Sequence, residues 1–282
     1  MPSVKEKEKS RSKQRALVDV ELRKLTKTER ELVDFEDEKP PFETTTLWDY
    51  PKQSYGRVQK GNNKFQGVTP AFIIWNMIQR YTQPGDLVVD PMAGSGTTVD
   101  VCKEEDRKVI GYDLYPQHPE VIKNDARHIP LKDSSVDMVF VDSPYGDNVD
   151  YSNEKGDIGK LSAEGEDFYS ALDTVAQEIY RILKPGKIVG WLIGDQWVKK
   201  KFTPVGFKIY KMLEQYFEPV DLICVARRNQ SSNTGVWHYR ARKFNFFLRG
   251  FKNLIIMRKP EATEEKAVHS VSEKKVNWKR YK

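Results

Sequence analysis

The residues that first suggest chemistry are the four letters DSPY, which follow the apolar run VDMVFV. Proline holds the residue before it in an extended conformation and cannot donate to a strand ladder. We therefore expect Asp142, Ser143, Pro144 and Tyr145 to stand open at the carboxyl edge of a sheet, where open α/β folds bind ligands. For these four residues alone, a tight loop without a catalytic role is the simpler explanation. A functional site is therefore supported only if other motifs in the sequence point to one.

A second candidate is the glycine-containing turn DPMAGSGTT, between a predicted strand at 87–90 and a predicted helix at 97–105. Gly94 and Gly96 permit a sharp turn and a close approach of ligand to backbone. Val99 replaces the third glycine of a dinucleotide fingerprint, and the Lys-Ser/Thr pair of a P-loop is missing. The turn therefore favours a nucleoside. Its candidate residues are Asp90, Pro91, Met92, Ala93, Gly94, Ser95, Gly96, Thr97 and Thr98.

Two further carboxylates stand at predicted strand ends. Asp113 ends the segment VIGYD, where a carboxylate suits the two hydroxyls of a ribose, although a helix N-cap also explains it. Asp125, followed by Ala126, ends a third short segment, where its carboxylate could accept from an adenine amino group. Together with the glycine turn, these strand ends predict a pocket for an adenosine-containing cofactor.

The elements that must position these residues alternate along the chain. Helices are predicted over residues 70–81, 97–105, 164–183 and 204–217, the third closed by Lys184-Pro185-Gly186. Strands are predicted over 87–90, 108–113, 136–142 and 188–193, with a final pair over 222–226 and 254–257. This order predicts an α/β fold with a doubly wound, mostly parallel sheet that ends in a C-terminal antiparallel hairpin.

The composition narrows the classes of protein to consider. Of the 282 residues, 38% are hydrophobic and 31% charged, which allows one core with polar ends. The net charge of +6 permits a polyanionic partner without requiring one. Cys102 and Cys224 offer no metal-site spacing and no disulfide framework, so we expect no metal and a cytoplasmic location. No stretch has the length of a membrane span or the pattern of a signal peptide.

DPMAGSGTT with DSPY resembles the S-adenosylmethionine-dependent DNA methyltransferases that modify adenine N6 or cytosine N4. Their hallmarks are Asp-Pro-Phe-x-Gly-x-Gly-Thr-Thr and (Asp/Asn/Ser)-Pro-Pro-Tyr, so Ser143 departs from the pattern. The likeness covers about residues 44–259 and includes RGFKNLIIMRK, which resembles the closing strand of the family. It implies a seven-stranded Rossmann-like sheet. It also implies that S-adenosylmethionine binds at the glycine turn, with Thr69 and Pro70 at the methionine end of the cofactor. We expect a methyltransferase domain over 41–260, a basic arm and lead-in over 1–40 and a basic tail over 261–282.

The resemblance also implies the chemistry of DSPY. An exocyclic amine is a poor nucleophile because its lone pair is delocalised into the ring, and accepting hydrogen bonds from both its hydrogens corrects this. The family assigns these acceptors to the carboxylate of Asp142 and the main-chain carbonyl of Ser143, while Tyr145 stacks on the base and Pro144 shapes the turn. The base must leave the duplex stack. Weaker candidates for lining the pocket are Trp48, Tyr50, Asp147, Asp150 and Tyr151.

A long basic and aromatic segment, RRNQSSNTGVWHYRARKFNFFLRGFK, occupies residues 227–252. Connections of this length are usually functional or disordered, and one subgroup of the family carries target recognition after the tetrapeptide. A solvated basic face is the alternative. The candidate DNA contacts are Arg227, Arg228, Asn229, Gln230, Trp237, His238, Arg240, Arg242 and Lys243.

These observations together predict a site-specific DNA methyltransferase. Adenine N6 is favoured over cytosine N4, because the tetrapeptide begins with Asp142 and cytosine enzymes usually have serine there. The alternatives are cytosine N4 methylation, methylation of RNA guanine N2, whose enzymes share an Asp-Pro-Pro-Tyr site, and an inactive nucleic-acid-binding module of the same fold. The expected partners are DNA and a cognate restriction endonuclease, and the chain is expected to act as a monomer or homodimer.

Overall fold

The computed structural model describes residues 39–62, 67–146, 152, 154, 156–198, 200–228 and 234–261. They divide into two compact units. Residues 39–41 and 55–59 belong to the smaller unit, while Phe42–Ser54 and the described residues from Lys60 onward form the larger one. The predicted arm and tail lie almost entirely outside the described residues. The sheet and the candidate site both belong to the larger unit.

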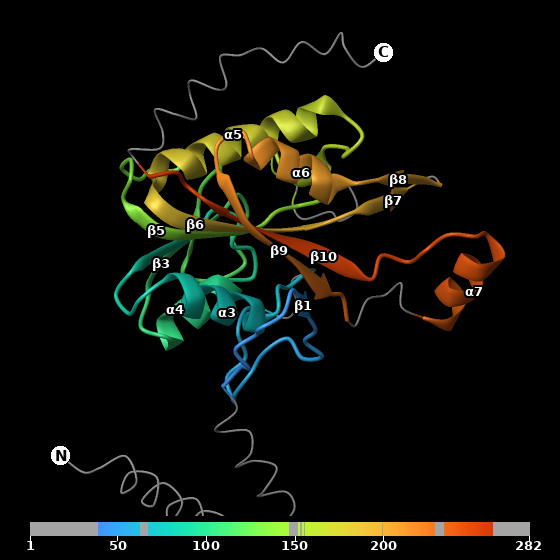
Figure 1. The fold of residues 1–282 in the computed structure, drawn as a ribbon, viewed down its shortest axis with the longest axis horizontal. Helices are drawn as coiled ribbons and strands as arrows, with labels where there is room; N and C mark the ends of the chain where they lie inside the picture. Colours follow the sequence, from blue (N-terminus) through green and yellow to red (C-terminus); the bar gives the residue numbers. More distant parts are fainter. Residues whose placement is uncertain are drawn as a thin grey trace, which may run out of the picture. The chain divides into compact units, whose positions relative to one another are not determined.

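An eight-stranded sheet forms the centre of the larger unit, in the order β1-β9-β10-β6-β5-β2-β3-β4 (Figure 1). The strands are β1 Leu47–Trp48, β2 Leu87–Asp90, β3 Lys108–Asp113, β4 Val121–Lys123, β5 Val136–Asp142, β6 Leu183–Gly194, β9 Glu218–Ala226 and β10 Phe251–Arg258. From β4 to β6 the neighbouring strands are parallel, whereas β10 runs antiparallel to both β6 and β9. The α/β class and the mostly parallel sheet are therefore confirmed.

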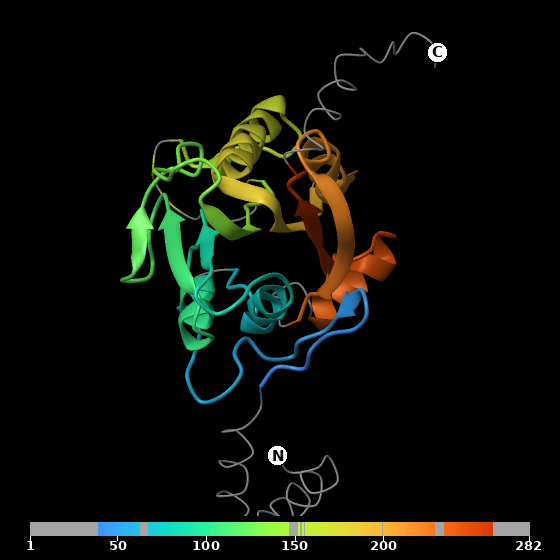
Figure 2. The ribbon, with the colours of Figure 1, turned by 60° about the vertical axis from the view of Figure 1, so that its left-hand side comes forward.

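Helices cover both faces of this sheet (Figures 1 and 2). Helices α5 (Glu166–Ile182) and α6 (Val205–Leu213) lie on one face, and α3 (Ala71–Tyr81) and α4 (Thr97–Glu104) lie on the other. The buried positions of α5 recur every three or four residues, which gives it one apolar stripe to place on the sheet. They are Phe168, Leu172, Val175, Ala176, Ile179 and Ile182. The doubly wound arrangement follows from two such pairs of helices.

The predicted elements agree with the observed ones at most positions. The strands at 87–90, 108–113 and 136–142 have the expected bounds, and the last two predicted strands pair antiparallel as β9 and β10. The helix at 204–217 is shorter than expected, because α6 ends at Leu213. Lys184-Pro185-Gly186 does not close α5 with a turn but lies within β6. The sheet has eight strands instead of seven because the two-residue β1 adds to β9.

Several short elements were not foreseen. A separate antiparallel pair, β7 (Gln196–Val198) and β8 (Lys201–Thr203), directly follows β6, and a 3-10 turn, η1, spans Ile158–Lys160. Helix α7 (Gly235–Lys243) lies within the segment that was expected to be a loop. In the part of the chain that the structure describes, no helix has the length and apolar character needed to cross a membrane.

Strand β5 illustrates how the fold presents the site. Its residues from Val136 to Val141 are buried between the parallel neighbours β2 and β6, and only its last residue, Asp142, is partly exposed. A strand buried on both faces is expected to be mostly apolar, which explains VDMVFV except for Asp137, whose carboxylate pairs with Lys184. Because β2, β3, β5, β6 and β9 point the same way, their carboxyl ends meet at one edge, and antiparallel β10 begins there.

Candidate active site

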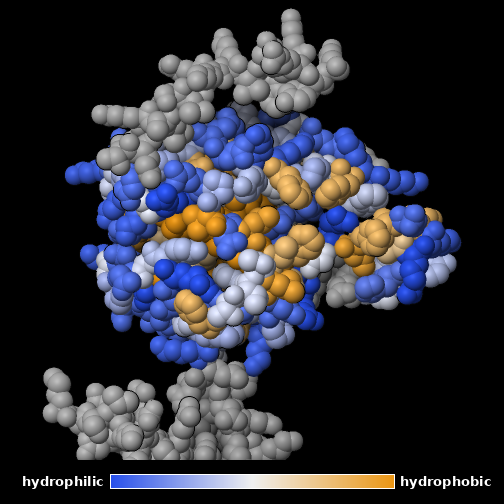
Figure 3. Space-filling model, viewed as in Figure 1, coloured by the Kyte–Doolittle hydropathy of each residue, from blue (hydrophilic) through white to orange (hydrophobic). Residues whose placement is uncertain are grey.

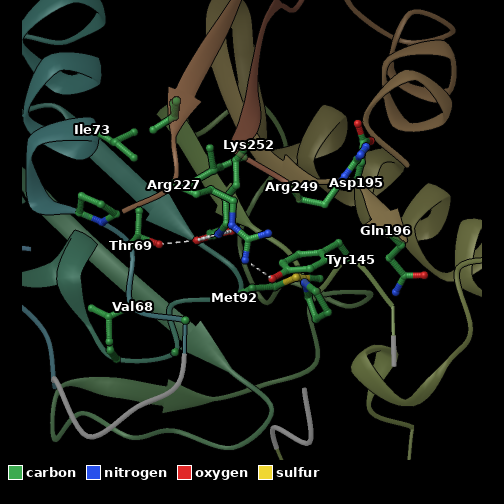
Figure 4. Close-up of a pocket in the computed structure, with 18 of the residues that line it drawn as sticks. Val68, Thr69, Ile73, Met92, Tyr145, Asp195, Gln196, Arg227, Arg249 and Lys252 are labelled. Atoms are coloured by element: carbon green, nitrogen blue, oxygen red, sulfur yellow. Dashed lines mark hydrogen bonds and ion pairs between the residues drawn. The ribbon is translucent and has the colours of Figure 1, made fainter. Parts of the chain in front are cut away.

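A cavity of about 1210 Å³ opens at this edge of the sheet. It is lined by the glycine turn after β2, the ends of β3 and β5, the segments 50–53 and 67–70, the start of β7, and the residues that join β9 to β10. Figure 4 shows Thr69, Tyr145, Arg227 and Lys252 converging at the end of β5. Residues that are widely separated in the sequence therefore share one site.

Asp90 supports the glycine turn from beneath and does not line the cavity. Its carboxylate accepts from the backbone N–H of Met92 at 3.0 Å and from the Thr98 hydroxyl at 2.5 Å. Asp90 is 3% exposed, and burial raises its pKa to about 7. The sequence predicts Asp90, Gly96, Thr97 and Thr98 as cofactor residues, but none of the four is among the residues that line the cavity.

The two glycines of the turn serve different purposes. Gly94 has φ +45°, and its N–H donates to Asp113 Oδ2 at 2.8 Å in the wall of the cavity. Gly96 caps α4 with φ +84°, and a Cβ there would lie 2.4 Å from Cγ of His118. Packing against a side chain, and not the approach of a ligand, therefore requires glycine at position 96.

Asp113 lines the cavity with spare hydrogen-bonding capacity. Its Oδ2 accepts from Gly94 N and its Oδ1 from Tyr115 N, both at 2.8 Å. A carboxylate offers about four lone-pair sites, so each oxygen can accept once more from a ligand hydroxyl. Burial raises the pKa of Asp113. Leu114 and Tyr115, which the sequence analysis did not single out, line the same part of the cavity.

Asp125 lines the cavity together with Ala126, but its carboxylate already has a strong partner. The Arg127 guanidinium contacts both carboxylate oxygens, with Nε 2.9 Å from Oδ1 and Nη2 2.6 Å from Oδ2, and the backbone N–H of Arg127 adds a bond of 3.0 Å to Oδ1. Burial acts to raise the pKa of Asp125. The hydrogen bonds and the charge of Arg127 have the larger effect, so the pKa of this carboxyl lies below its usual value. An adenine amino group would have to share this carboxylate with Arg127.

Asp142 occupies the end of β5 and makes contacts to two other elements. The Thr69 hydroxyl donates to its Oδ2 at 2.5 Å, and Lys252 Nζ lies 2.8 Å from Oδ1 and 2.9 Å from Oδ2. The Thr69 carbonyl in turn accepts from Gln53 Nε2 at 2.5 Å. The sequence motifs predict Asp142 and Thr69 as site residues but give no sign that Lys252 belongs to this site.

The other residues of the tetrapeptide are fixed by neighbouring strands. Ser143, 2% exposed, accepts a hydrogen bond at 2.9 Å from Trp191 Nε1 on β6. The Tyr145 ring lines the cavity beside Pro144, and its hydroxyl accepts from Arg227 Nη2 at 3.0 Å. The Arg227 guanidinium also lies 5.5 Å from the centre of that ring. The hydroxyl of Ser143 is therefore engaged by a buried indole.

The predicted DNA contacts fall into separate groups. Arg227 and Arg228 both line the cavity. Arg228 also pairs with Asp49 through Nε at 2.7 Å, which holds the pKa of the Asp49 carboxyl below its usual range. Asn229 and Gln230 lie outside the described residues. Trp237, His238, Arg240, Arg242 and Lys243 all belong to α7. Only Trp237 of that group lines the cavity.

Helix α7 has no buried residue and projects away from the sheet (Figure 1). Its cations lie over its own aromatic rings, with Arg240 at 5.0 Å from the Trp237 ring and Lys243 at 5.7 Å from the Tyr239 ring. Figure 3 shows hydrophobic and hydrophilic side chains mixed over this protruding end. A nine-residue helix without a buried face is marginal in water, so α7 is well suited to acquire a binding partner.

The weaker pocket candidates are divided in the same way. Trp48 is buried and donates from Nε1 to the Thr45 carbonyl at 2.8 Å, away from the cavity. Tyr50 lines the cavity and stacks on Phe72 with ring centres 5.0 Å apart. Asp147, Asp150 and Tyr151 lie outside the described residues. Gln196, which the sequence analysis missed, also lines the cavity, with its buried Nε2 lacking a partner among the described residues.

Comparison with known proteins finds one matching family model. Residues 3–124 match the family model N6_N4_Mtase, described as DNA methylase. This part of the chain is similar to the N6/N4 DNA methylases, and it makes up less than half of the 282 residues. The match contains the glycine turn and Asp113 and ends before Asp142. The resemblance drawn from the motifs is thus confirmed, and S-adenosylmethionine is the cofactor of this family.

Individual methylases match shorter stretches of the chain. The Type II methyltransferase M.Cfr9I of Citrobacter freundii is 42% identical over 55 residues, which cover 20% of this chain and 18% of that protein. The DNA adenine methyltransferase YhdJ of Escherichia coli K12 is 31% identical over 111 residues, which cover 38% of this chain and 36% of that protein. The chain thus spans less than two fifths of the length of either methylase.

Solved structures resemble the chain more distantly. A SAM-dependent methyltransferase from Methanosarcina mazei is 15% identical to this chain, with a TM-score of 0.43. The alignment covers 66% of this chain and 97% of that protein. A second structure is that of a Thermus thermophilus protein proposed to be a DNA modification methylase, complexed with S-adenosyl-L-methionine. It is 22% identical to this chain, with a TM-score of 0.35, and the alignment covers 49% of this chain and 54% of that protein. Both scores are below 0.5, so the fold assignment rests on the strand order of the chain itself.

Proposed function

We propose that this protein transfers a methyl group from S-adenosylmethionine to an exocyclic amino group of a base in DNA, with adenine N6 favoured over cytosine N4. One observation carries the proposal: Asp142 and the glycine turn line the same cavity, at the ends of the neighbouring strands β5 and β2. A methyl donor and an amine held by these two parts would face each other, and alignment of this kind supplies much of the rate of a transfer reaction.

The cofactor end of the cavity fits an adenosine derivative. Asp113 can accept from two ribose hydroxyls through the lone-pair sites that Gly94 and Tyr115 leave open. The backbone of Gly94 at positive φ lets the ligand approach without meeting a Cβ. When bound, S-adenosylmethionine supplies an electrophilic methyl group on its sulfonium. Thr69 and Pro70 line the same cavity, and Thr69 contacts Asp142, so this segment is suited to the methionine moiety.

The base end of the cavity supplies the acceptors that the amine requires. Asp142 accepts three hydrogen bonds, one from Thr69 and two from Lys252, which leaves one of its about four lone-pair sites for an amino hydrogen. The main-chain carbonyl of Ser143 is the second acceptor. The Asp142 carboxylate and the Ser143 carbonyl draw the amino hydrogens away from the plane of the base. The nitrogen lone pair is then directed at the methyl group.

Tyr145 is positioned to stack on the target base. Arg227 holds its hydroxyl at 3.0 Å, which fixes the orientation of the ring in the cavity wall. Stacking on an aromatic ring stabilises a base by about 1–3 kcal/mol and does not depend on its identity. A base in duplex DNA reaches such a ring only after leaving the stack, which costs a few kcal/mol. Tyr145 therefore offsets part of the cost of extrusion.

Helix α7 is the proposed contact to DNA outside the cavity. Arg240, Arg242 and Lys243 are exposed on a helix that is joined to the cavity through Trp237. Cations of this kind bind phosphates without regard to sequence, whereas base edges are read by side chains in the grooves. A cognate restriction endonuclease and the oligomeric state stay predictions from the resemblance.

The proposal is tested by incubating the protein with tritiated S-adenosylmethionine and either DNA or RNA. We expect label in DNA, and nuclease digestion with mass spectrometry should then yield N6-methyladenine. N4-methylcytosine would correct the choice of base, while label in RNA alone would contradict the assignment to DNA.

Asp142→Ala should lower the rate of methyl transfer about a hundred- to a thousand-fold, the usual loss on removing a preorganised hydrogen-bonding group. Calorimetric titration should show nearly unchanged cofactor affinity, because Asp113 and the glycine turn are untouched. Asp133→Ala, which removes a carboxylate that is 77% exposed, is the matched control and should leave the rate unchanged. A rate within a few-fold of wild type in Asp142→Ala would show that the carboxylate is not the acceptor.

A further inference from the structure

Lys252 reaches the catalytic end of β5 from a strand that joins the sheet on the far side of β6. Asp142 pairs with Leu192 on the neighbouring strand β6, and Leu192 pairs with Leu254 on β10. Side chains alternate between the two faces of a strand, so Lys252, two residues before Leu254, projects on the same face as Asp142. The strand order therefore brings these two side chains together across 110 residues of sequence.

The contact between Lys252 and Asp142 is close and largely shielded from solvent. Nζ lies 2.8 Å from Oδ1 and 2.9 Å from Oδ2, and the two side chains are 16% and 12% exposed. A shielded ion pair contributes little net stability, because removing both charges from water costs about as much as their attraction returns. Both residues line the cavity. A role toward a ligand explains the pair better than a role in folding.

We propose that Lys252 determines specificity by donating a hydrogen bond to the ring nitrogen that adjoins the target amine. An acceptor oxygen beside an N–H donor is the pattern that thymine presents to adenine and that guanine presents to cytosine. Asp142 and Lys252 present the same pattern, with carboxylate oxygen and ammonium nitrogen about one hydrogen-bond length apart. The inference rests on the proposed function and extends it to the base edge that the site reads.

The pair also accounts for the rejection of other bases. Thymine and guanine carry a carbonyl oxygen where adenine and cytosine carry the amine, and a ring N–H where these carry a free ring nitrogen. The oxygen would face the Asp142 carboxylate, and the ring N–H would face the Lys252 ammonium. A site built to hydrogen-bond one edge rejects a base with the opposite edge strongly, because its buried polar groups are left unpaired.

A different role would have different consequences. If Lys252 only occupied the space beside Asp142 until the base arrived, it would leave the carboxylate on binding and would not contact the ring nitrogen. If it were only structural, its removal would slow the transfer to every substrate equally. Substrates that lack the ring nitrogen separate these cases from the proposal.

The experiment compares DNA duplexes in which the methylated base is natural or lacks the nitrogen next to the amine. These analogues are 1-deazaadenine, where the product is N6-methyladenine, and 3-deazacytosine, where it is N4-methylcytosine. The ratio of kcat/KM for the natural and deaza sites is measured for wild type and for Lys252→Met. The change in intrinsic nucleophilicity of the amine cancels, because it affects both proteins alike.

We expect the natural-to-deaza ratio to be about ten- to a hundred-fold larger in wild type than in Lys252→Met, the usual effect of losing a hydrogen bond to a charged group. Lys211→Met, which changes a lysine that is 73% exposed on α6, should keep the wild-type ratio. Calorimetry with S-adenosylmethionine checks that the variants are folded, and Lys252→Gln replaces Lys252→Met if the latter does not bind the cofactor. 7-Deazaadenine keeps the ring nitrogen next to the amine. The ratio of kcat/KM for adenine and 7-deazaadenine sites should therefore be the same in wild type and in Lys252→Met.

Equal natural-to-deaza ratios in wild type and Lys252→Met, with methyl transfer intact, would overturn the inference and leave the proposed function standing. A wild-type protein that transfers no methyl group to any DNA would overturn the proposed function, and the inference with it. A faster Lys252→Met enzyme with an unchanged ratio would identify the lysine as an occupant of the empty site.

Discussion

At the scale of single residues, Ser143 takes part in packing as well as in the backbone of the tetrapeptide. Its hydroxyl accepts from the indole N–H of Trp191, a side chain that is fully buried. A buried donor without an acceptor costs about 1–3 kcal/mol. The proline that the family carries at this position has no hydroxyl, so the serine and the tryptophan form a matched pair in this chain.

Ser143→Pro should therefore lower the free energy of unfolding by about 1–3 kcal/mol, because the Trp191 N–H loses its acceptor. Urea denaturation measures the loss. In the double variant Ser143→Pro with Trp191→Phe, both polar groups are gone and most of the stability should return. A single variant as stable as wild type would mean that the hydrogen bond contributes nothing.

The residues of the site differ in how well the sequence could reveal them. Asp142, Gly94 and Asp113 stand at fixed distances from predicted strand ends, so strand prediction alone brought them to one edge. Lys252 could not be found in this way, because its contact to Asp142 depends on the position of β10 in the sheet. The reason for glycine at position 96 was also hidden, since the side chain that requires it comes from His118.

At the scale of elements, α7 combines exposed cations and aromatic rings on a short helix that buries none of its residues. The sequence indicated a loop there because a helix without an apolar stripe shows no periodic signal. Strand β1 was missed for a related reason, since two residues form no pattern. By contrast, the sequence predicts β5 with its observed bounds, because its buried residues are apolar except for Asp137 and because Pro144 prevents the strand from continuing.

Arg240→Ala and Arg242→Ala should each weaken DNA binding and flatten its dependence on salt. Each phosphate contact that is lost lowers the slope of log K against log salt by about one. Fluorescence anisotropy with a labelled duplex at several salt concentrations measures both quantities. Cofactor affinity should not change, because neither arginine lines the cavity.

Lys108→Ala is the matched control for these variants. Lys108 is an exposed cation at the amino end of β3, opposite the edge that carries the site, so its loss should leave the slope unchanged. An unchanged slope in both arginine variants would identify α7 as a solvated face.

At the scale of the whole molecule, stability depends on pH through Asp90. Burial raises its pKa from 3.8 to about 7, so between these values the folded chain binds more protons than the unfolded chain. The free energy of unfolding should therefore fall as pH rises through this window, by up to on the order of 4 kcal/mol for a shift of about three pKa units.

Asp90→Asn should remove this part of the pH dependence, because the amide does not titrate. Urea denaturation at intervals from pH 4 to pH 8 should show a shallower decline for the variant than for wild type, with the two curves diverging most between pH 5 and pH 7. Parallel curves would indicate that the carboxyl has an ordinary pKa in the folded protein.

The position of β10 has a consequence for synthesis on the ribosome. Strand β10 is the last of the described strands to be translated, yet it lies between β6 and β9, which are both made earlier. Until residue 258 has emerged, β6 has an open edge, and β9 has only the two-residue β1 as a sheet partner. Open strand edges template aggregation, so the nascent chain is exposed to this risk until translation is almost finished. A polypeptide interrupted before β10 would carry the glycine turn and Asp142 on a divided sheet.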